Sequence, residues 1–100
     1  MKANRATRVT INREFASADR FISEYVTNIS QSGIFIRSDD PLPTGTTVNL
    51  RFTIIMEDME TIEGVGRVVR VSHDPPGMGV VFVQLAPQSK QLIQRLLRRR

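Results

Sequence analysis

Cysteine and tryptophan are absent from this 100-residue sequence, which has one histidine and one tyrosine. The lack of cysteine excludes a disulfide framework, a thiol nucleophile and a thiolate metal site, and it is typical of a reducing compartment. No apolar run approaches the length needed to cross a bilayer, and the basic first residues are not followed by the apolar segment of a signal peptide. We therefore expect a cytoplasmic protein without membrane insertion.

The scarcity of histidine leaves little for catalysis. His73 stands in the run SHD at 72–74. Neighbouring side chains of an extended chain point to opposite faces, so these three cannot form a nucleophile, a base and an orienting acid. The acidic residues Glu57, Asp58 and Glu60 lack the spacing and the glycine of a calcium loop and are typical of a solvated turn. We predict no enzyme, no metal site and no cofactor.

Aromatic residues are few as well, at 6% of the chain. The net charge is +4 and the basic residues gather near both ends, which suggests an anionic partner. A small β-protein that binds single-stranded nucleic acid stacks the bases on exposed aromatic side chains. Phe15 is ambiguous, but strand patterns assign the other phenylalanines to the core, so we expect no nucleic-acid partner. The phenylalanines assigned to the core are Phe21, Phe35, Phe52 and Phe82.

What the sequence does contain is the length and composition of one globular domain, 40% hydrophobic and 24% charged. Most of it alternates apolar and polar residues with the period of a strand, between segments rich in turn residues. Strands are predicted in RVTINREF, FISEYVTNIS, IFIRS, VNLRFTI, TIEGVGRVVRVSH and MGVVFVQL. Short strands with regular turns favour a six-stranded antiparallel β-barrel over residues 9–85.

The last segment, APQSKQLIQRLLRRR, changes to helical periodicity. Leu92, Ile93, Leu96 and Leu97 recur at helical spacing, and Pro87 suits a first helical turn. We predict a C-terminal α-helix over residues 87–98 that caps an opening of the barrel. Residues 1–8 are expected to be a flexible basic arm, so that residues 1–100 form a single domain.

The stretch NISQSG at 28–33 places an amide and a hydroxyl before a glycine. In an extended segment Asn28 and Ser30 share one face, and Gly33 allows a turn conformation closed to most other residues. Asn hydrogen-bonds a base edge as donor and acceptor, Ser bonds a phosphate or a base, and a nearby guanidinium grips either. This group suits a guanine nucleotide. The alternative is that the same side chains satisfy backbone groups of the turn.

NISQSG matches the Asp/Asn-x-Ser-x-x-Gly motif of the PilZ domain family. The resemblance continues through PLPTGTTVNLRF, GVGRVVRV and GMGVVFVQL to the terminal helix, and it covers nearly the whole chain. The sequence looks especially like a divergent branch of PilZ-like domains. The resemblance implies a six-stranded barrel that binds the second messenger cyclic di-GMP and relays the signal to a downstream protein partner, in settings such as motility.

The family pattern before the first strand is Arg-x-x-x-Arg, whose arginines contact phosphate and stack on guanine. The matching stretch here is NRATR, in which Arg8 fits the second arginine, Asn4 replaces the first and Arg5 is one place out of register. Because Asn carries no charge and cannot stack as a guanidinium does, part of the expected anion grip is missing. The ligand site implied by the resemblance consists of Arg5, Arg8, Asn28, Ser30 and Gly33. The alternative is a degenerate adaptor that does not bind cyclic di-GMP and acts only through protein–protein contacts.

Overall fold

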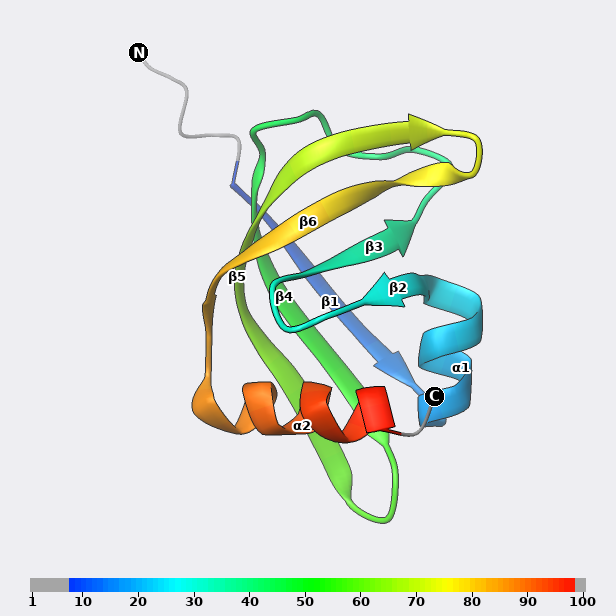
Figure 1. The fold of residues 1–100 in the computed structure, drawn as a ribbon, viewed down its shortest axis with the longest axis vertical. Coiled ribbons are helices and arrows are strands. Elements are labelled where there is room, and N and C mark those ends of the chain that lie inside the picture. The colour runs from blue at the N-terminus through cyan, green and yellow to red at the C-terminus, as the bar shows by residue number, and fades with distance from the viewer. Residues whose placement is uncertain (1–7, 99–100) are drawn as a thin grey trace.

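The fold is that of a computed structural model, which describes residues 8–98 apart from the side chain of Thr27. The elements are, in chain order, β1 (Arg8–Phe15), α1 (Ala18–Arg20), the π-helix η2 (Phe21–Tyr25), β2 (Val26–Ile29), β3 (Gly33–Arg37), β4 (Thr47–Ile55), β5 (Met59–His73), β6 (Pro76–Leu85) and α2 (Pro87–Arg98). Figure 1 shows a strongly twisted sheet with α2 crossing one end. The prediction of a mainly β protein with a C-terminal helix is confirmed. The expected arm at 1–8 lies outside the described residues, except for Arg8, which begins β1.

The predicted antiparallel barrel is wrong in two respects. The strands form one sheet in the order β1-β4-β5-β6-β3-β2, and within residues 8–98 its edge strands β1 and β2 do not pair with each other. In addition, β1 pairs with β4 in parallel, whereas the other pairings are antiparallel. Period-two alternation indicates which residues face the core but carries no information on strand direction. The link from β1 to β2 is helical rather than a tight turn. The rule that a tight turn joins two adjacent antiparallel strands therefore does not apply to β1.

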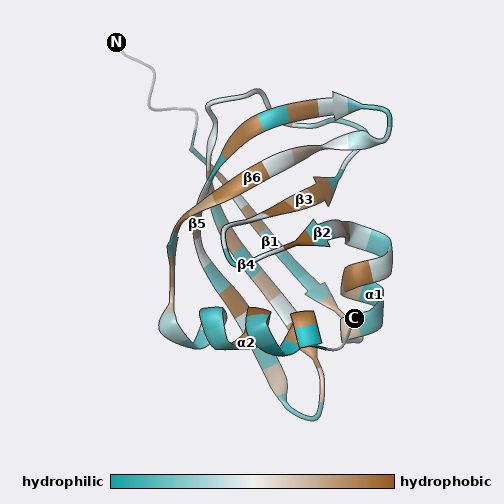
Figure 2. Ribbon diagram, in the orientation of Figure 1, coloured by the Kyte–Doolittle hydropathy of each residue, from teal (hydrophilic) through white to brown (hydrophobic). Residues whose placement is uncertain are grey.

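The core lies on one face of this sheet, and β4 shows the pattern most clearly. Val48, Leu50, Phe52 and Ile54 are buried, while the residues between them face outward. Figure 2 shows the matching alternation of hydrophobic and hydrophilic positions along the strands. The helix α2 adds Leu92, Ile93 and Leu96, which are also buried. None of the helices among residues 8–98 is both long and apolar enough to span a bilayer.

The strand predicted over FISEYVTNIS is wrong in its first half, which is helical. The Ser17 hydroxyl caps α1 by accepting a hydrogen bond from the Arg20 backbone N–H at 3.1 Å. Ala18, Phe21 and Tyr25 follow at helical spacing and are all buried. The cap and this spacing are the signals of a helix, and they outweigh the local alternation that suggested a strand.

Four aromatic rings join the edge strand β1 to the helical link and to β4. The ring centroid of Phe15 lies 5.0 Å from that of Phe21 and 5.1 Å from that of Tyr25. Phe52 lies 5.6 Å from Phe21 and 5.5 Å from Tyr25. Such edge and tilted contacts add about 0.5–1.5 kcal/mol each beyond the burial of apolar area. This aromatic cluster therefore packs the helical link against β1 and β4.

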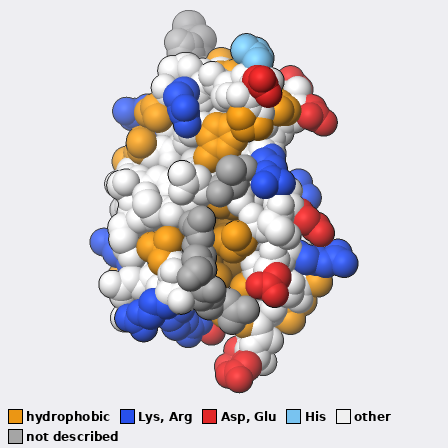
Figure 3. All heavy atoms as spheres, turned by 45° about the vertical axis from the view of Figure 1, so that its right-hand side comes forward, with side chains coloured by type: hydrophobic (Ala, Val, Ile, Leu, Met, Phe, Trp, Pro, Cys, Tyr) orange, Lys and Arg blue, Asp and Glu red, His pale blue; other side chains and the backbone are white. Residues whose placement is uncertain are grey.

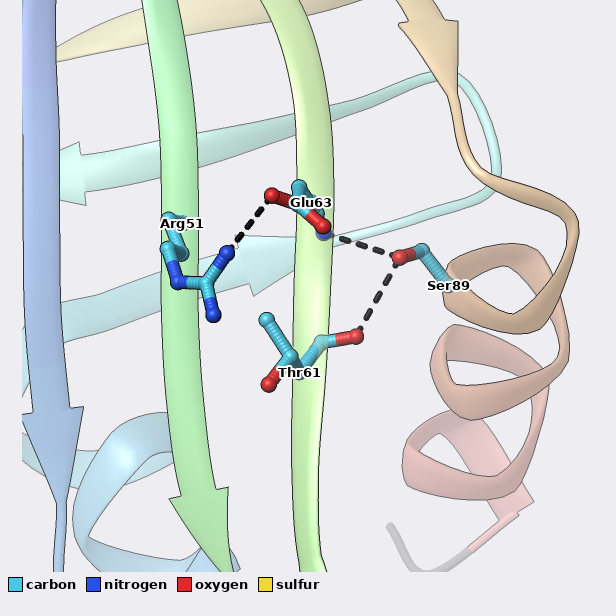
Figure 4. A network of polar contacts seen from close by, with 4 residues as sticks. All are labelled: Arg51, Thr61, Glu63 and Ser89. Carbon is cyan, nitrogen blue, oxygen red and sulfur yellow. Dashed lines mark hydrogen bonds and ion pairs between the residues drawn. The ribbon is translucent and has the colours of Figure 1, made fainter.

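In addition to its buried apolar residues, helix α2 binds the sheet through one buried hydroxyl. Strand β5 extends beyond β6, whose pairing with it starts at Gly64. At the unpaired end the Ser89 hydroxyl accepts a hydrogen bond from the Glu63 backbone N–H at 2.8 Å and donates one to the Thr61 carbonyl at 3.2 Å (Figure 4). The Arg51–Glu63 ion pair drawn beside it is half exposed and so contributes little. Ser89 thus takes the place of a neighbouring strand.

Removing this hydroxyl should destabilise the protein without changing its fold. Ser89→Ala leaves the Glu63 N–H and the Thr61 carbonyl without their partner in a site where Ser89 is fully buried. We expect the free energy of unfolding to fall by about 1–3 kcal/mol, measured by urea denaturation. Ser23→Ala, at an exposed position, is the matched control and should change stability little. Equal stability of the two variants would contradict the role given to Ser89.

The tyrosine of the aromatic cluster provides a second test. Burial raises the pKa of Tyr25 above its usual 10.0, and the Arg13 guanidinium, 4.8 Å from the ring centroid, opposes that rise. The absorbance of phenolate reports Tyr25 alone, because the chain has no other tyrosine and no tryptophan. We expect a midpoint above 10 in the native protein and about 10 in urea. The free energy of unfolding should therefore fall as the pH rises from the unfolded pKa through the folded one.

The matched variants are Arg13→Ala and, at an exposed position of α1, Arg20→Ala. Loss of Arg13 removes the opposing charge and should raise the Tyr25 midpoint further, whereas loss of Arg20 should leave it in place. A midpoint that falls or stays constant in Arg13→Ala would contradict this account.

Candidate functional site

A shallow cavity opens on the outer face of the sheet, where four strands present one row of residues. In this row Asn28 on β2 pairs with Phe35 on β3, Phe35 pairs with Gly79 on β6, and Gly79 pairs with Arg70 on β5. The cavity has a volume of about 270 Å³. It is lined by Asn28, Ser30, Gly33, Ile34, Phe35, Val69, Arg70, Gly79, Val80 and Val81. It therefore gathers residues from positions 28 to 81 of the chain.

The turn at one rim is held by Ser30. The Ser30 backbone N–H donates to the Gly33 carbonyl at 2.9 Å. The Ser30 hydroxyl oxygen accepts hydrogen bonds from the backbone N–H groups of Ser32 at 3.2 Å and of Gly33 at 3.3 Å. The alternative function considered for this serine, satisfaction of turn backbone groups, is thus present in the structure. The same bonds fix the exposed serine at the edge of the cavity.

Gly33 is required for a different reason from the one predicted. Its φ is not positive, and within residues 8–98 the positive-φ residue is Gly45. A Cβ at Gly33 would lie 2.6 Å from the Val80 carbonyl oxygen, closer than real Cβ contacts come. Glycine is therefore needed for the close approach of β3 to β6, and the prediction of a special turn conformation is wrong.

An arginine and a phenylalanine meet across β6 because that strand carries glycine between them. The Arg70 guanidinium carbon lies 5.5 Å from the centroid of the Phe35 ring. A Cβ at Gly79 would be 3.6 Å from the Arg70 Nε and 3.8 Å from its Nη2, so the Arg70 side chain lies over Gly79. The Phe35 ring in turn covers Gly77, where a Cβ would be 2.5 Å from the ring edge. The glycines of GMG leave room for both side chains.

Sequence reasoning missed both of these residues. Phe35 was assigned to the core, but it is only half-buried, and its ring lines the cavity. Arg70 faces Gly79 because the pairing of β5 with β6 shifts by one residue between Val68 and Arg70. A bulge of this kind has no clear sequence signature. The available signal was the paired glycines of GMG, which a strand rarely carries without a close approach above it.

The predicted arginines do not join this cavity. Arg8 lies on β1, four strands away from Gly33 in the sheet order. Its Nε and Nη2 donate hydrogen bonds to the Asn49 Oδ1 on β4, at 3.1 and 2.9 Å. Arg5 lies outside the described residues. Of the five predicted site residues, the structure brings together Asn28, Ser30 and Gly33.

A second and larger cavity, of about 560 Å³, lies near the β4–β5 hairpin and α2. Its cation, Arg95, forms an ion pair with Glu60 at 2.6 Å. Size alone would favour this cavity, but its positive charge is already paired within the protein. Figure 3 shows hydrophobic side chains exposed between charged ones on the side of the molecule where β2 and β3 lie. The smaller cavity, with its exposed arginine, is therefore the better candidate for an anionic ligand.

The comparison with known families gives one match. The sequence model of the PilZ domain matches residues 2–99. No curated protein matches the chain significantly. The matched range contains the whole outer-face cavity as well as Arg8, so the family signal extends over the sheet and the terminal helix.

The placement of Arg70 can be tested by filling the space at Gly79. Gly79→Val keeps a residue suited to strands but puts methyl groups where the Arg70 guanidinium lies. We expect the upfield ring-current shift of the Arg70 δ-protons, caused by Phe35, to be lost in the NMR spectrum. In Gly79→Ala the shift should persist, because a Cβ there makes only ordinary contacts with Arg70. An unchanged shift in Gly79→Val would show that Arg70 does not cross this strand.

Proposed function

Because the chain belongs to the PilZ domain family, a family of cyclic di-GMP-binding adaptor domains, we propose that it binds cyclic di-GMP and relays the signal to a protein partner. The observation that supports this proposal is the meeting of three motif residues, Asn28, Ser30 and Gly33, in one exposed cavity. The resemblance adds Arg5 and Arg8 as ligand contacts. The function proposed is recognition rather than chemical conversion.

Each residue of the cavity has a distinct part in the proposed site. The Asn28 amide provides both a donor and an acceptor for a guanine edge. The Ser30 hydroxyl fixes the turn and lies at the rim, where it can meet a phosphate oxygen. Gly33 allows β3 to approach β6 closely. The exposed side chains of Val69 and Val81 offer apolar surface for the face of a base.

The relay follows from what a bound nucleotide would cover. Val69 and Val81 are 49% and 39% exposed in the cavity, and Val83, further along β6, is 57% exposed. A ligand over the first two would remove apolar surface and put charged phosphates beside the third. A protein partner that contacts this part of β6 would therefore meet a different surface in the bound and free states.

Calorimetric titration with cyclic di-GMP at moderate salt tests the proposal. We expect saturable binding that is absent with GTP and cyclic di-AMP. Asn28→Ala and Ser30→Ala, which remove the two polar side chains of the motif from the cavity, should each weaken binding, by roughly tenfold or more where a hydrogen bond to the ligand is lost. Circular dichroism should show that both variants keep the fold.

The opposite outcome has an equally clear meaning. No heat and no NMR shifts with millimolar ligand would contradict the proposal and favour the degenerate adaptor, in which Asn4 has replaced the first motif arginine and the Arg8 guanidinium is engaged by Asn49. Binding that is unaffected in both variants would show that the ligand lies elsewhere on the protein.

A further inference from the structure

We propose that Arg70, held against Phe35, is the ligand-binding cation of the outer-face cavity and contacts a phosphodiester of the bound nucleotide. This inference rests on the proposed function, because it assigns a residue to the same site. It adds a contact outside both the Asp/Asn-x-Ser-x-x-Gly and the Arg-x-x-x-Arg motifs.

Arg70 lies at the cavity. Arg70 is separated from Asn28 by two intervening strands, yet both line the cavity. Its side chain reaches toward Asn28 because it lies over Gly79 rather than pointing straight out from the sheet. Arg8, the arginine that the motif assigns to the ligand, is turned toward Asn49 on the far side of β5 and does not line the cavity. The arginine that lines it is Arg70.

The positive charge of Arg70 is available to a ligand. The Arg70 contact in the structure is with a neutral ring, and no carboxylate among residues 8–98 forms an ion pair with it. Arg51 and Arg95, by contrast, are paired with Glu63 and Glu60. A guanidinium keeps its full charge at any physiological pH and presents a planar set of donors that matches phosphate oxygens. Arg70 thus supplies a positive charge that no ion pair within residues 8–98 neutralises, as an anionic ligand requires.

The Arg70 side chain is oriented by its neighbours in the free protein. A long side chain loses rotamer freedom when it binds a ligand, and this loss has an entropic cost. The Phe35 ring, 5.5 Å from the guanidinium, and the bare backbone of Gly79 hold Arg70 in place before any ligand arrives. Part of that cost is therefore met within the free protein. Arg70 offers the charge that Asn4 cannot provide in the N-terminal motif.

The test is calorimetry with cyclic di-GMP on the full chain, at low and at moderate salt. Arg70→Ala should weaken binding by roughly tenfold or more and should make the affinity less dependent on salt. Arg70→Lys keeps the charge but loses the planar donors. Its affinity should lie between those of the unmodified protein and of Arg70→Ala. The matched control is Arg67→Ala, an exposed arginine on the same strand that does not line the cavity. It removes the same charge and should bind within about twofold of the unmodified protein.

A further variant, Phe35→Leu, keeps Arg70 but removes the ring that orients it. We expect weaker binding with the salt dependence retained, and wild-type affinity would overturn the orienting role of Phe35. If the unmodified protein binds and Arg70→Ala keeps both its affinity and its salt dependence, the inference about Arg70 is wrong while the proposed function stands. If the unmodified protein does not bind, the proposed function fails, and the assignment of Arg70 fails with it.

Discussion

Within residues 8–98 the edge strands β1 and β2 do not pair with each other, so side chains rather than backbone bonds connect the two edges of the sheet. Phe15 on β1 and Phe52 on β4 meet Phe21 and Tyr25 from the helical link in one aromatic cluster. Backbone bonds fix the neighbouring strands within the sheet, whereas ring packing, in place of a closing ladder, joins β1 to the helical link that precedes β2. The cluster therefore ties the helical link, which leads into β2 and the NISQSG turn, to β1 and β4.

The candidate site shows how a flat sheet surface becomes a recognition surface. A cavity on the outer face needs walls, and here they come from residues that lie over the two glycines of β6. Phe35 lies over Gly77 and Arg70 lies over Gly79, so that β6 forms the floor. Both walls come from neighbouring strands and meet in a cation–π contact. The rim is supplied by a turn whose own serine hydroxyl holds it closed.

The sequence predicts well what depends on a local period and poorly what depends on distant partners. The alternation in β4 indicates its buried residues correctly, and of the helical stripe of α2 Leu92, Ile93 and Leu96 are buried while Leu97 is partly buried. The parallel pairing of β1 with β4 could not be predicted, since alternation says nothing about direction. Arg70 was missed because a bulge, absent from any local pattern, decides which residue of β5 faces the cavity. The helical segment before β2 can be predicted from the sequence, because Ser17 is a suitable N-cap and Ala18, Phe21 and Tyr25 recur at helical spacing.

The bond between Ser89 and β5 also decides where the chain tolerates a change of length. Two paired strands can shift their register by whole residues and still form hydrogen bonds. The Ser89 hydroxyl, by contrast, reaches both the Glu63 N–H and the Thr61 carbonyl at only one position and one rotation of α2 about its axis. One residue inserted in the first turn of α2, between Pro87 and Ser89, would rotate the hydroxyl by about 100° and shift it by about 1.5 Å. An insertion or deletion in this turn should therefore destabilise the contact, whereas the exposed hairpin tip at 57–58 tolerates one. Homologues of different length should differ at such tips and keep the spacing from sheet to helix.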